Sequence, residues 1–208
     1  MSLQSDAHPP VYVLIGGQSR RFGTDKATHS VEGVPWAIDV GCRLAPAGDF
    51  VFVGQPRTPG VFAQVRTIAD WPGGVGPLAG VIAALEDRLA MHGPGTIVIA
   101  SCDLVRPHRD LLIPLLEAIE ADRTLDAAAY RAADLWQPFP AVLHTRLLDR
   151  AIDVAAEGGA LQRLFAQRAY AAPWSAHSAG PPQANSLTEL AEHLAAAAPS
   201  KNPPRTLG

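Results

Sequence analysis

The sequence has few cysteines and no long apolar run, and each shortage excludes a class of protein. Its two cysteines, Cys42 and Cys102, show neither CxxC nor Cys/His spacing, which argues against a disulfide scaffold or a zinc site. A reduced, cytoplasmic setting is therefore expected. No run of about 18 or more apolar residues occurs, so no membrane span is predicted. Residues 1–10 also lack the charged start and apolar centre of a signal peptide.

Basic residues are also fewer than acidic residues. The chain has 17 Lys and Arg residues against 20 Asp and Glu residues, a formal net charge of −3. No overall positive field is available to attract nucleic acid or an anionic membrane, so neither is expected as a partner. Any phosphate group must be bound locally, by a loop and a few side chains.

Strands and helices alternate along the 208 residues, 48% of which are hydrophobic. Short apolar runs predict strands at 11–15, 49–53, 65–68, 96–100, 126–130 and 139–144. Apolar spacing and capping signals predict helices at 35–44, 78–89, 107–120, 146–156 and 186–198. This order predicts an α/β fold with a doubly wound, mostly parallel sheet flanked by helices. We expect one domain at 11–198, with flexible ends at 1–10 and 199–208.

The segment after the first strand has the composition of a phosphate-binding loop. Gly16 and Gly17 let backbone N–H groups approach an anion closely, because no Cβ stands in the way. Arg20, Arg21 and Lys26 follow as cations. The spacing is neither that of a Walker A loop nor GxGxxG. Taken alone, the segment also fits an ordinary surface loop.

Two carboxylates follow predicted strands, where ligands of such sheets bind. Asp103 comes after 96–100, and Asp70 comes after 65–68 and before the glycine-rich stretch 73–80. Mg²⁺ typically takes one or two protein carboxylates together with substrate phosphates and water, so a lone Asp103 suffices. The alternatives are that Asp103 caps the following helix and that 73–80 is an ordinary turn.

A resemblance to a known family adds to this interpretation. Residues 14–27 read L-I-G-G-Q-S-R-R-F-G-T-D-K-A, which resembles the L-A-G-G-x-S-x-R-M-G-x-D-K-A signature of the MobA-like molybdenum cofactor guanylyltransferases. Cys102-Asp103 is similar to that family's C-D element, and Asp70 with G-P-L-A-G at 76–80 is similar to another. Ile15 and Phe22 replace the usual alanine and methionine, and Gly54 stands near a position where some members have asparagine.

The resemblance implies a nucleotidyltransferase that moves GMP from Mg-GTP to a molybdopterin-type cofactor and releases pyrophosphate. It implies catalytic roles for Arg21, Lys26 and Asp103, with Asp103 as the Mg²⁺ ligand. The implied nucleotide-binding residues are Leu14, Ile15, Gly16, Gly17, Lys26, Asp70, Gly76 and Asp103. On the acceptor side it suggests Arg163 and Asn185. Protein partners in keeping with it are molybdoenzymes or their chaperones.

Two other functions stay open at this point. A relative could transfer CMP to the same cofactor, or a nucleotide to another small phosphate, although the Gly16-Gly17 pair favours guanine because cytidylyl relatives tend toward A-A-G here. A protein of another class could hold nucleotide or cofactor without turning it over. Retention of Lys26, Asp70 and Asp103 argues for an enzyme.

Overall fold

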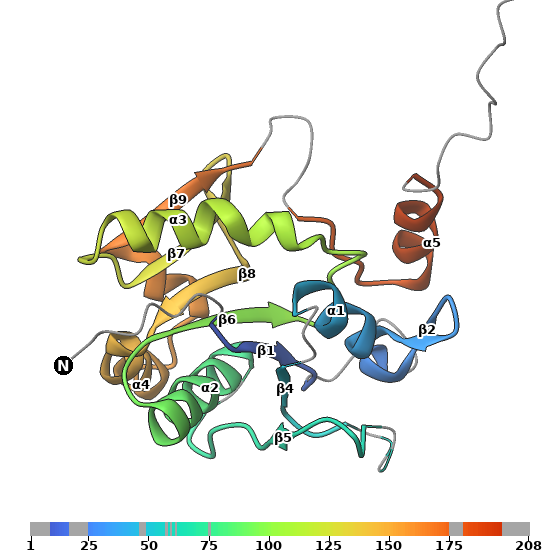
Figure 1. Ribbon diagram of the computed structural model, residues 1–208, viewed down its shortest axis with the longest axis horizontal. Coiled ribbons are helices and arrows are strands. Elements are labelled where there is room, and N and C mark those ends of the chain that lie inside the picture. Colours follow the sequence, from blue (N-terminus) through green and yellow to red (C-terminus); the bar gives the residue numbers. More distant parts are fainter. Residues whose placement is uncertain are drawn as a thin grey trace, which may run out of the picture.

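A seven-stranded sheet forms the centre of the computed structural model, which describes residues 9–16, 25–45, 49–56, 58, 60, 62–74, 76–174 and 181–196 (Figure 1). Its strand order is β5-β4-β1-β6-β8-β7-β9. The strands are β1 (Val11–Leu14), β4 (Phe50–Val53), β5 (Thr67–Ile68), β6 (Thr96–Ser101), β7 (Ala127–Ala132), β8 (Leu135–His144) and β9 (Ala169–Pro173).

Most neighbouring strands run parallel, as predicted. β1 pairs in parallel with β4 and β6, β4 with β5, and β7 with β9. Only β8 runs against its neighbours β6 and β7 within the described residues. The reason is the short turn between β7 and β8, in which Ala133 takes a positive φ of 52°. Two-residue hairpin turns need such values and reverse the chain directly.

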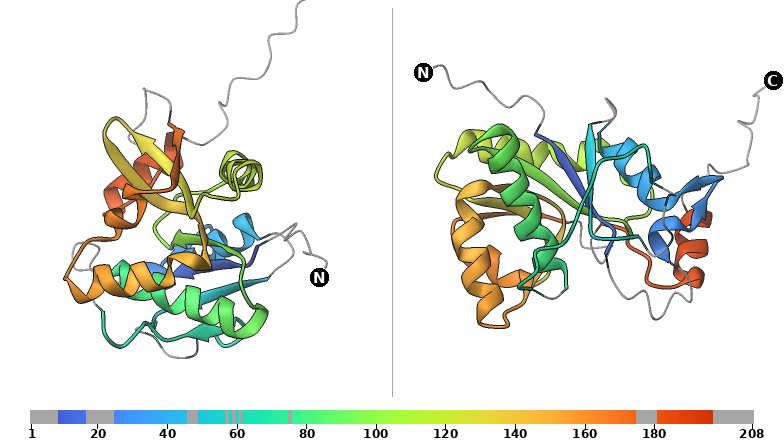
Figure 2. Two further views of the ribbon diagram at one scale, coloured as in Figure 1. Left: turned by 90° about the vertical axis from the view of Figure 1, so that its left-hand side faces the viewer. Right: turned by 90° about the horizontal axis from the view of Figure 1, so that it is seen from below.

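Two helices cover each face of the sheet (Figures 1 and 2). α1 (Trp36–Leu44) and α3 (Ile113–Ala121) share one apolar cluster with the sheet, and α2 (Pro77–His92) and α4 (Leu148–Ala156) share the other. Side chains alternate along each strand, so in β1 Val13 packs on the α1 side and Tyr12 on the α2 side. Burial on both faces explains why β1 and the central residues 97–100 of β6 are apolar.

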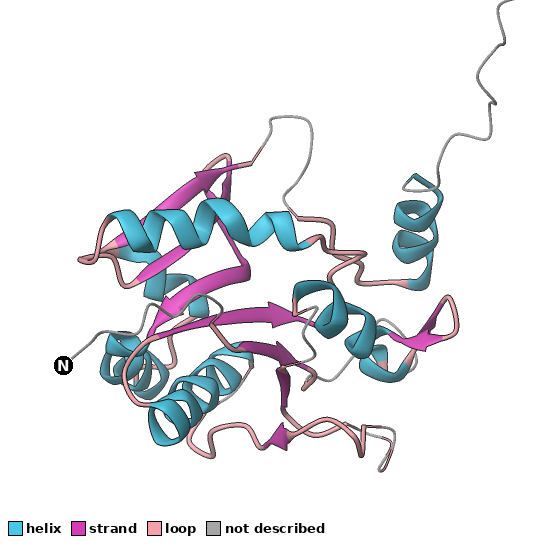
Figure 3. Cartoon of the chain, viewed as in Figure 1, coloured by secondary structure: helices cyan, strands magenta, loops and turns pink. Residues whose placement is uncertain are grey.

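Smaller elements fill the connections (Figure 3). They are the hairpin of β2 (Ser30–Val31) and β3 (Val34–Pro35), and the 3₁₀ helices η1 (Lys26–Thr28), η2 (Arg109–Leu112), η3 (Thr145–Leu147) and η4 (Leu161–Ala166). The last helix, α5 (Leu187–Ala196), lies beside the β2–β3 hairpin (Figures 1 and 2). The predicted capping box starts α5, because Ser186 Oγ accepts from the Glu189 amide at 3.1 Å.

Several predicted elements differ from the structure. The helix expected at 107–120 is the 3₁₀ helix η2 followed by α3, which begins at Ile113 because Pro114 is tolerated only in a first turn. Pro35 was expected inside the first turn of α1 but ends β3 just before it. The strand β9 was not predicted. Residues 1–8 and 197–208 lie outside the described part, so flexible ends stay a prediction.

The order of the strands creates a switch point between β1 and β6. From β1 the chain continues to β4 on one side, whereas from β6 it continues to the β8 and β7 side. Connections that diverge in this way leave a crevice at the carboxyl ends of the two strands. Gly16 follows β1 and Asp103 follows β6 at this crevice. No helix of the described residues has the length and apolar character needed to cross a bilayer.

Candidate active site

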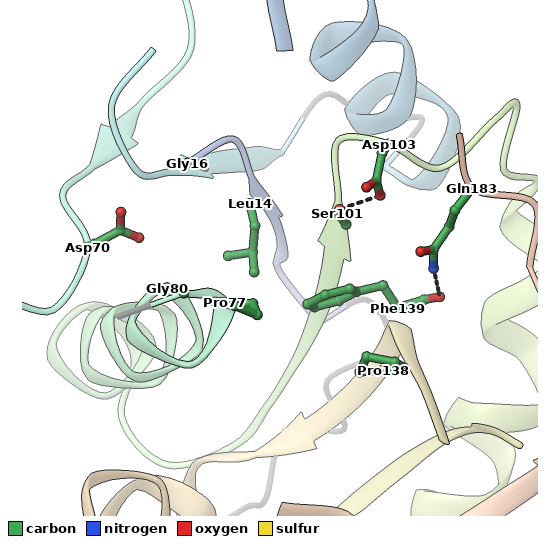
Figure 4. A pocket seen from close by; sticks show the side chains of 11 residues that line it. Leu14, Gly16, Asp70, Pro77, Gly80, Ser101, Asp103, Pro138, Phe139 and Gln183 are labelled. Atoms are coloured by element: carbon green, nitrogen blue, oxygen red, sulfur yellow. Dashed lines mark hydrogen bonds between the residues drawn. The ribbon is translucent and has the colours of Figure 1, made fainter. Parts of the chain in front are cut away.

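A cavity of about 580 Å³ opens at this crevice (Figure 4). Pockets of about 300–1,000 Å³ are typical for small molecules and cofactors. Three strand ends, the start of α2, the first part of β8 and the segment before α5 line it. The lining residues are Leu14, Gly16, Asp70, Gly76, Pro77, Gly80, Ser101, Asp103, Pro138, Phe139 and Gln183.

Glycine backbone surrounds the Asp70 carboxylate at one end of the cavity. A Cβ added to Gly16 would lie 3.0 Å from Asp70 Oδ2, and one added to Gly80 would lie 3.2 Å from Asp70 Oδ1. Gly54 has a φ of +101°, and a Cβ there would lie 2.7 Å from the Gly16 nitrogen. The partial burial of the Asp70 carboxyl raises its pKa above the ordinary value. Because these positions are glycines, the Asp70 carboxylate lies directly against backbone atoms at this end of the cavity.

The amino end of α2 faces the same cavity. Gly76 is its N-cap residue and Pro77 its first helical residue, and both line the cavity. Gly76 has no side chain to occupy the amides of the first turn, and these amides carry the partial positive charge of the helix. Such an end favours a bound anion.

Lys26 lies on η1 and points toward the carboxyl end of β6. Its Nζ donates to the carbonyl of Ala184 at 3.1 Å and to Asn185 Oδ1 at 3.2 Å, and it lies 3.5 Å from Asp103 Oδ2. Asp25 fixes the start of η1, because its Oδ1 accepts from the Ala27 amide at 3.1 Å. The Lys26 ammonium group, on the connection that follows β1, therefore lies partly buried at the carboxyl end of β6.

Asp103 is held from three directions. Its Oδ1 accepts a hydrogen bond from Ser101 Oγ at 2.5 Å (Figure 4), its carbonyl accepts from the Ala184 amide at 3.0 Å, and its Oδ2 faces Lys26. The Lys26 and Asp103 side chains are 12% and 18% exposed. Because little solvent screens them, their charges act strongly on any ligand that enters the cavity.

The segment 181–186, called the strap below, closes the opposite side of the cavity. The Val105 amide donates to the Pro182 carbonyl at 2.8 Å, and Leu104 and Gln183 form an antiparallel bridge. Gln183 Nε2 also donates to the Phe139 carbonyl at 3.4 Å (Figure 4). The strap thus ties the loop after β6 to the start of β8.

The other predicted site residues have different locations. Ile15 is buried in the apolar cluster under α1, so its side chain does not line the cavity. Arg163 lies on η4 with its guanidinium 2.6 Å from the Glu157 carboxylate, and the described lining of the cavity does not include it. Gly17 and Arg21 lie outside the described residues.

Sequence reasoning missed Ser101 and Phe139 as parts of the site. Ser101 is the last residue of β6 and Asp103 lies in the turn just after it, so a hydroxyl two residues before a strand-end carboxylate is close enough to bind it. That spacing is a usable signal. Phe139 gave none, because an aromatic residue in an apolar strand reads equally well as core.

Comparison with known proteins identifies the family. Residues 11–172 match the profile of the MobA-like NTP transferase domain. The chain belongs to this family. Its fold is that of a nucleotidyltransferase, and the cavity described here lies within the part of the MobA-like domain that the profile covers, apart from Gln183.

Individual relatives of this MobA-like chain carry a common name. The molybdenum cofactor guanylyltransferase of Pseudomonas putida (strain GB-1) is 33% identical over 152 residues, which cover 69% of this chain and 75% of the relative. That of Burkholderia ambifaria (strain MC40-6) is 31% identical over 169 residues, covering 73% and 76%. The crystal structure of molybdopterin-guanine dinucleotide biosynthesis protein A from Archaeoglobus fulgidus has a TM-score of 0.70 at 23% identity, covering 90% of this chain and 98% of that one.

Proposed function

We propose that the protein is a molybdenum cofactor guanylyltransferase, which transfers GMP from Mg-GTP to a molybdopterin-type cofactor and releases pyrophosphate. One observation carries the proposal: Lys26 contacts Asp103 at the carboxyl end of β6, and Asp103 lines a cavity of about 580 Å³ that is also lined by glycine backbone and a helix amino end. The names of the relatives supply the guanine nucleotide and the acceptor.

The residues present fit a magnesium ion. Mg²⁺ prefers hard oxygen ligands and keeps several phosphate or water ligands, so one carboxylate can hold it. Asp103 Oδ2 lies 3.5 Å from Lys26 Nζ, longer than the about 2.7–2.9 Å of a firm charge-assisted hydrogen bond. This oxygen is therefore the one we assign to the ion. When bound, Mg²⁺ would neutralise oxygens of the α- and β-phosphates.

The cavity offers a separate side to each of the two reactants in this scheme. The triphosphate would lie against Gly16 and the amino end of α2, where backbone N–H groups bind anions. The acceptor would enter from the side of Pro138, Phe139 and Gln183. Its terminal phosphate oxygen forms the new bond to the α-phosphorus as the bond from that atom to the bridging oxygen of pyrophosphate breaks. No general base is needed, since the attacking phosphate is already an anion.

Lys26 has one task in this scheme, and it must move to perform it. Its ammonium group stabilises the negative charge that develops on the departing pyrophosphate. To reach the phosphates it must release at least one of its contacts to Asp103, Ala184 and Asn185. The contact to Asp103 is the longest and is given up most easily. Arg21 is proposed as a second cation for pyrophosphate, on the resemblance alone. Asn185 and Arg163 stay proposals for the acceptor side.

The decisive experiment measures magnesium-dependent pyrophosphate release with GTP, CTP, ATP and UTP, each with and without molybdopterin. Release with GTP that requires both Mg²⁺ and molybdopterin is the expected result. Release with CTP instead would assign the chain to cytidylyl transfer. Nucleotide binding without release under every condition would contradict an enzymatic role and leave a binding protein.

Asp103→Asn tests the role of the carboxylate, because it keeps the shape of the side chain and removes its charge. We expect this variant to lose turnover by a factor of about 10²–10³ or more while its thermal unfolding stays close to that of the parent protein. Near-normal turnover in Asp103→Asn would remove this residue from the reaction.

A further inference from the structure

Ser101 occupies a fixed position next to the carboxylate that the proposed function assigns to the metal. It is the last residue of β6 and pairs with Leu14 of β1. Its carbonyl accepts from the Leu104 amide at 3.3 Å, which closes a turn over residues 101–104. Sheet and turn together leave the backbone on both sides of the Ser101 side chain little freedom.

The Ser101 hydroxyl can donate one hydrogen bond, and it donates that bond to Asp103. The Oγ to Oδ1 distance is 2.5 Å, at the short end of hydrogen bonds from a hydroxyl to a carboxylate. Lys26 lies on the other carboxylate oxygen, Oδ2, at 3.5 Å. The two oxygens of Asp103 therefore have different partners, one close and neutral and one distant and charged.

This difference decides which oxygen can change its partner. Lys26 has two further acceptors on the strap, the Ala184 carbonyl and Asn185 Oδ1, and can leave Oδ2 without losing every bond. Ser101 can keep its bond to Oδ1 throughout. Without the hydroxyl, the carboxylate could rotate and offer both oxygens to the Lys26 ammonium.

We propose that Ser101 is a positioning residue that keeps one oxygen of Asp103 occupied, so that the other binds the divalent ion from a single direction. The inference rests on the proposed function for the presence of the ion. Removing such a supporting partner of a metal ligand typically costs about 10- to 100-fold in metal affinity. Ser101 itself touches neither metal nor substrate in this role.

The test measures magnesium dependence without turnover. The probe is the GTP analogue with a methylene group between its α- and β-phosphorus atoms, which cannot release pyrophosphate, and its binding is followed by calorimetry as Mg²⁺ is varied. In Ser101→Ala we expect the half-saturating Mg²⁺ concentration to rise about 10- to 100-fold. Ser101→Thr keeps the hydroxyl and should stay near the parent value.

Turnover provides a second, separate measurement. Pyrophosphate release by Ser101→Ala should show a raised KM for Mg²⁺ and a kcat near that of the parent once Mg²⁺ is saturating. Thr96→Val, which removes a hydroxyl at the opposite end of the same strand, should change neither quantity. If Ser101→Ala does not fold, Ser101→Cys keeps the volume with a weaker donor and should show a smaller shift in the same direction.

Two results would overturn the inference. One is an unchanged magnesium dependence of analogue binding in Ser101→Ala. The other is a lower rate at saturating Mg²⁺ with an unchanged KM for the ion, because the hydroxyl would then act on a substrate. A parent protein that releases no pyrophosphate, yet binds the analogue with a magnesium dependence that Ser101→Ala weakens, would refute the proposed function and uphold the role of Ser101.

Discussion

Lys26 Nζ lies 3.5 Å from Asp103 Oδ2, although 77 residues separate the two in the sequence. One residue follows the loop after β1 and the other follows β6, the two parallel strands that flank the switch point of the sheet. The sheet alone places the ends of these strands side by side. The contact therefore joins a cation and a carboxylate that belong to different connections of the fold.

Replacing Lys26 tests the cationic half of this pair. In Lys26→Ala we expect pyrophosphate release to fall by a factor of about 10²–10³, because a preorganised group that stabilises the leaving charge is lost. The rate of pyrophosphate release is the measurement. Arg43→Ala, which removes a cation from the Arg43–Asp39 ion pair of α1, is the control and should keep the parent rate. A Lys26→Ala variant with parent-like turnover would contradict the mechanism.

Gly54→Ala tests the close packing of backbone around the cavity. A Cβ at this position would lie 2.7 Å from the Gly16 nitrogen and would also meet a φ of +101°, so we expect a loss of stability of about 1–3 kcal/mol together with weaker GTP binding. Gly93→Ala is the matched control, since Gly93 has a φ of +74° but sits at the far end of α2, where a Cβ would have no described atom within 4 Å.

Urea unfolding and nucleotide titration separate the two effects of these glycine changes. Gly93→Ala should lose about 1–2 kcal/mol through its backbone alone and bind GTP as the parent does. Equal GTP affinity in both variants would show that contact between Gly54 and Gly16 does not shape the nucleotide site.

Asp70→Asn should separate stability from function. Partial burial raises the pKa of Asp70 above its ordinary 3.8, so the ionised carboxylate destabilises the fold at neutral pH. This cost is absent below the ordinary pKa and appears as pH rises through the folded pKa. Asp70→Asn should therefore be more stable at pH 7, by less than about 1 kcal/mol because solvent reaches the carboxylate. The gain should vanish below pH 3.8.

Urea unfolding of Asp70→Asn across the pH range is the measurement, with GTP binding determined in parallel at pH 7. We expect weaker binding alongside the higher stability, since the carboxylate faces the cavity. A variant that is less stable at neutral pH would show that Asp70 makes a net favourable contact in the folded protein.

Tyr12→Phe tests a network on the α2 side of the sheet. The Tyr12 hydroxyl donates to Asp87 Oδ2 at 2.7 Å, and Arg66 binds the same carboxylate. Loss of a hydrogen bond to a charged group should cost about 1.5–3 kcal/mol of stability. Turnover should stay unchanged, because the network lies outside the cavity. Tyr170→Phe, on the exposed side of β9, is the control for the substitution itself.

Strand-end reasoning pointed to two residues that line the cavity. β1 and the centre of β6 are apolar, so the positions of both strands in the sequence were clear. The rule that ligands bind beyond the carboxyl ends of parallel strands then pointed to Gly16 and Asp103. That Lys26 would reach Asp103 could be expected only from the resemblance. The position of Lys26 next to Asp103 depends on η1, and no sequence signal predicted this short helix.

Other features depend on partners far away in the chain. β9 consists mostly of alanine and ends in Pro173, so it lacks the β-branched residues and the alternation that predict a strand. It forms because β7 offers a free edge for parallel pairing. In the same way, the strap acceptors of Lys26 could not be inferred locally, since Ala184 and Asn185 lie 158 and 159 residues away from it in the sequence.

The match to the MobA-like domain ends at residue 172, whereas the strap begins at residue 181. A fragment cut at the end of that match would keep six strands of the seven-stranded sheet whole and most of β9. It would keep Asp103 but lack the Ala184 carbonyl and the Asn185 side chain, which accept hydrogen bonds from the Lys26 ammonium. During synthesis the same order applies, since the ribosome releases the strap after every strand of the sheet. A growing chain therefore contains every strand of the sheet before the strap residues that bind Lys26 have been added.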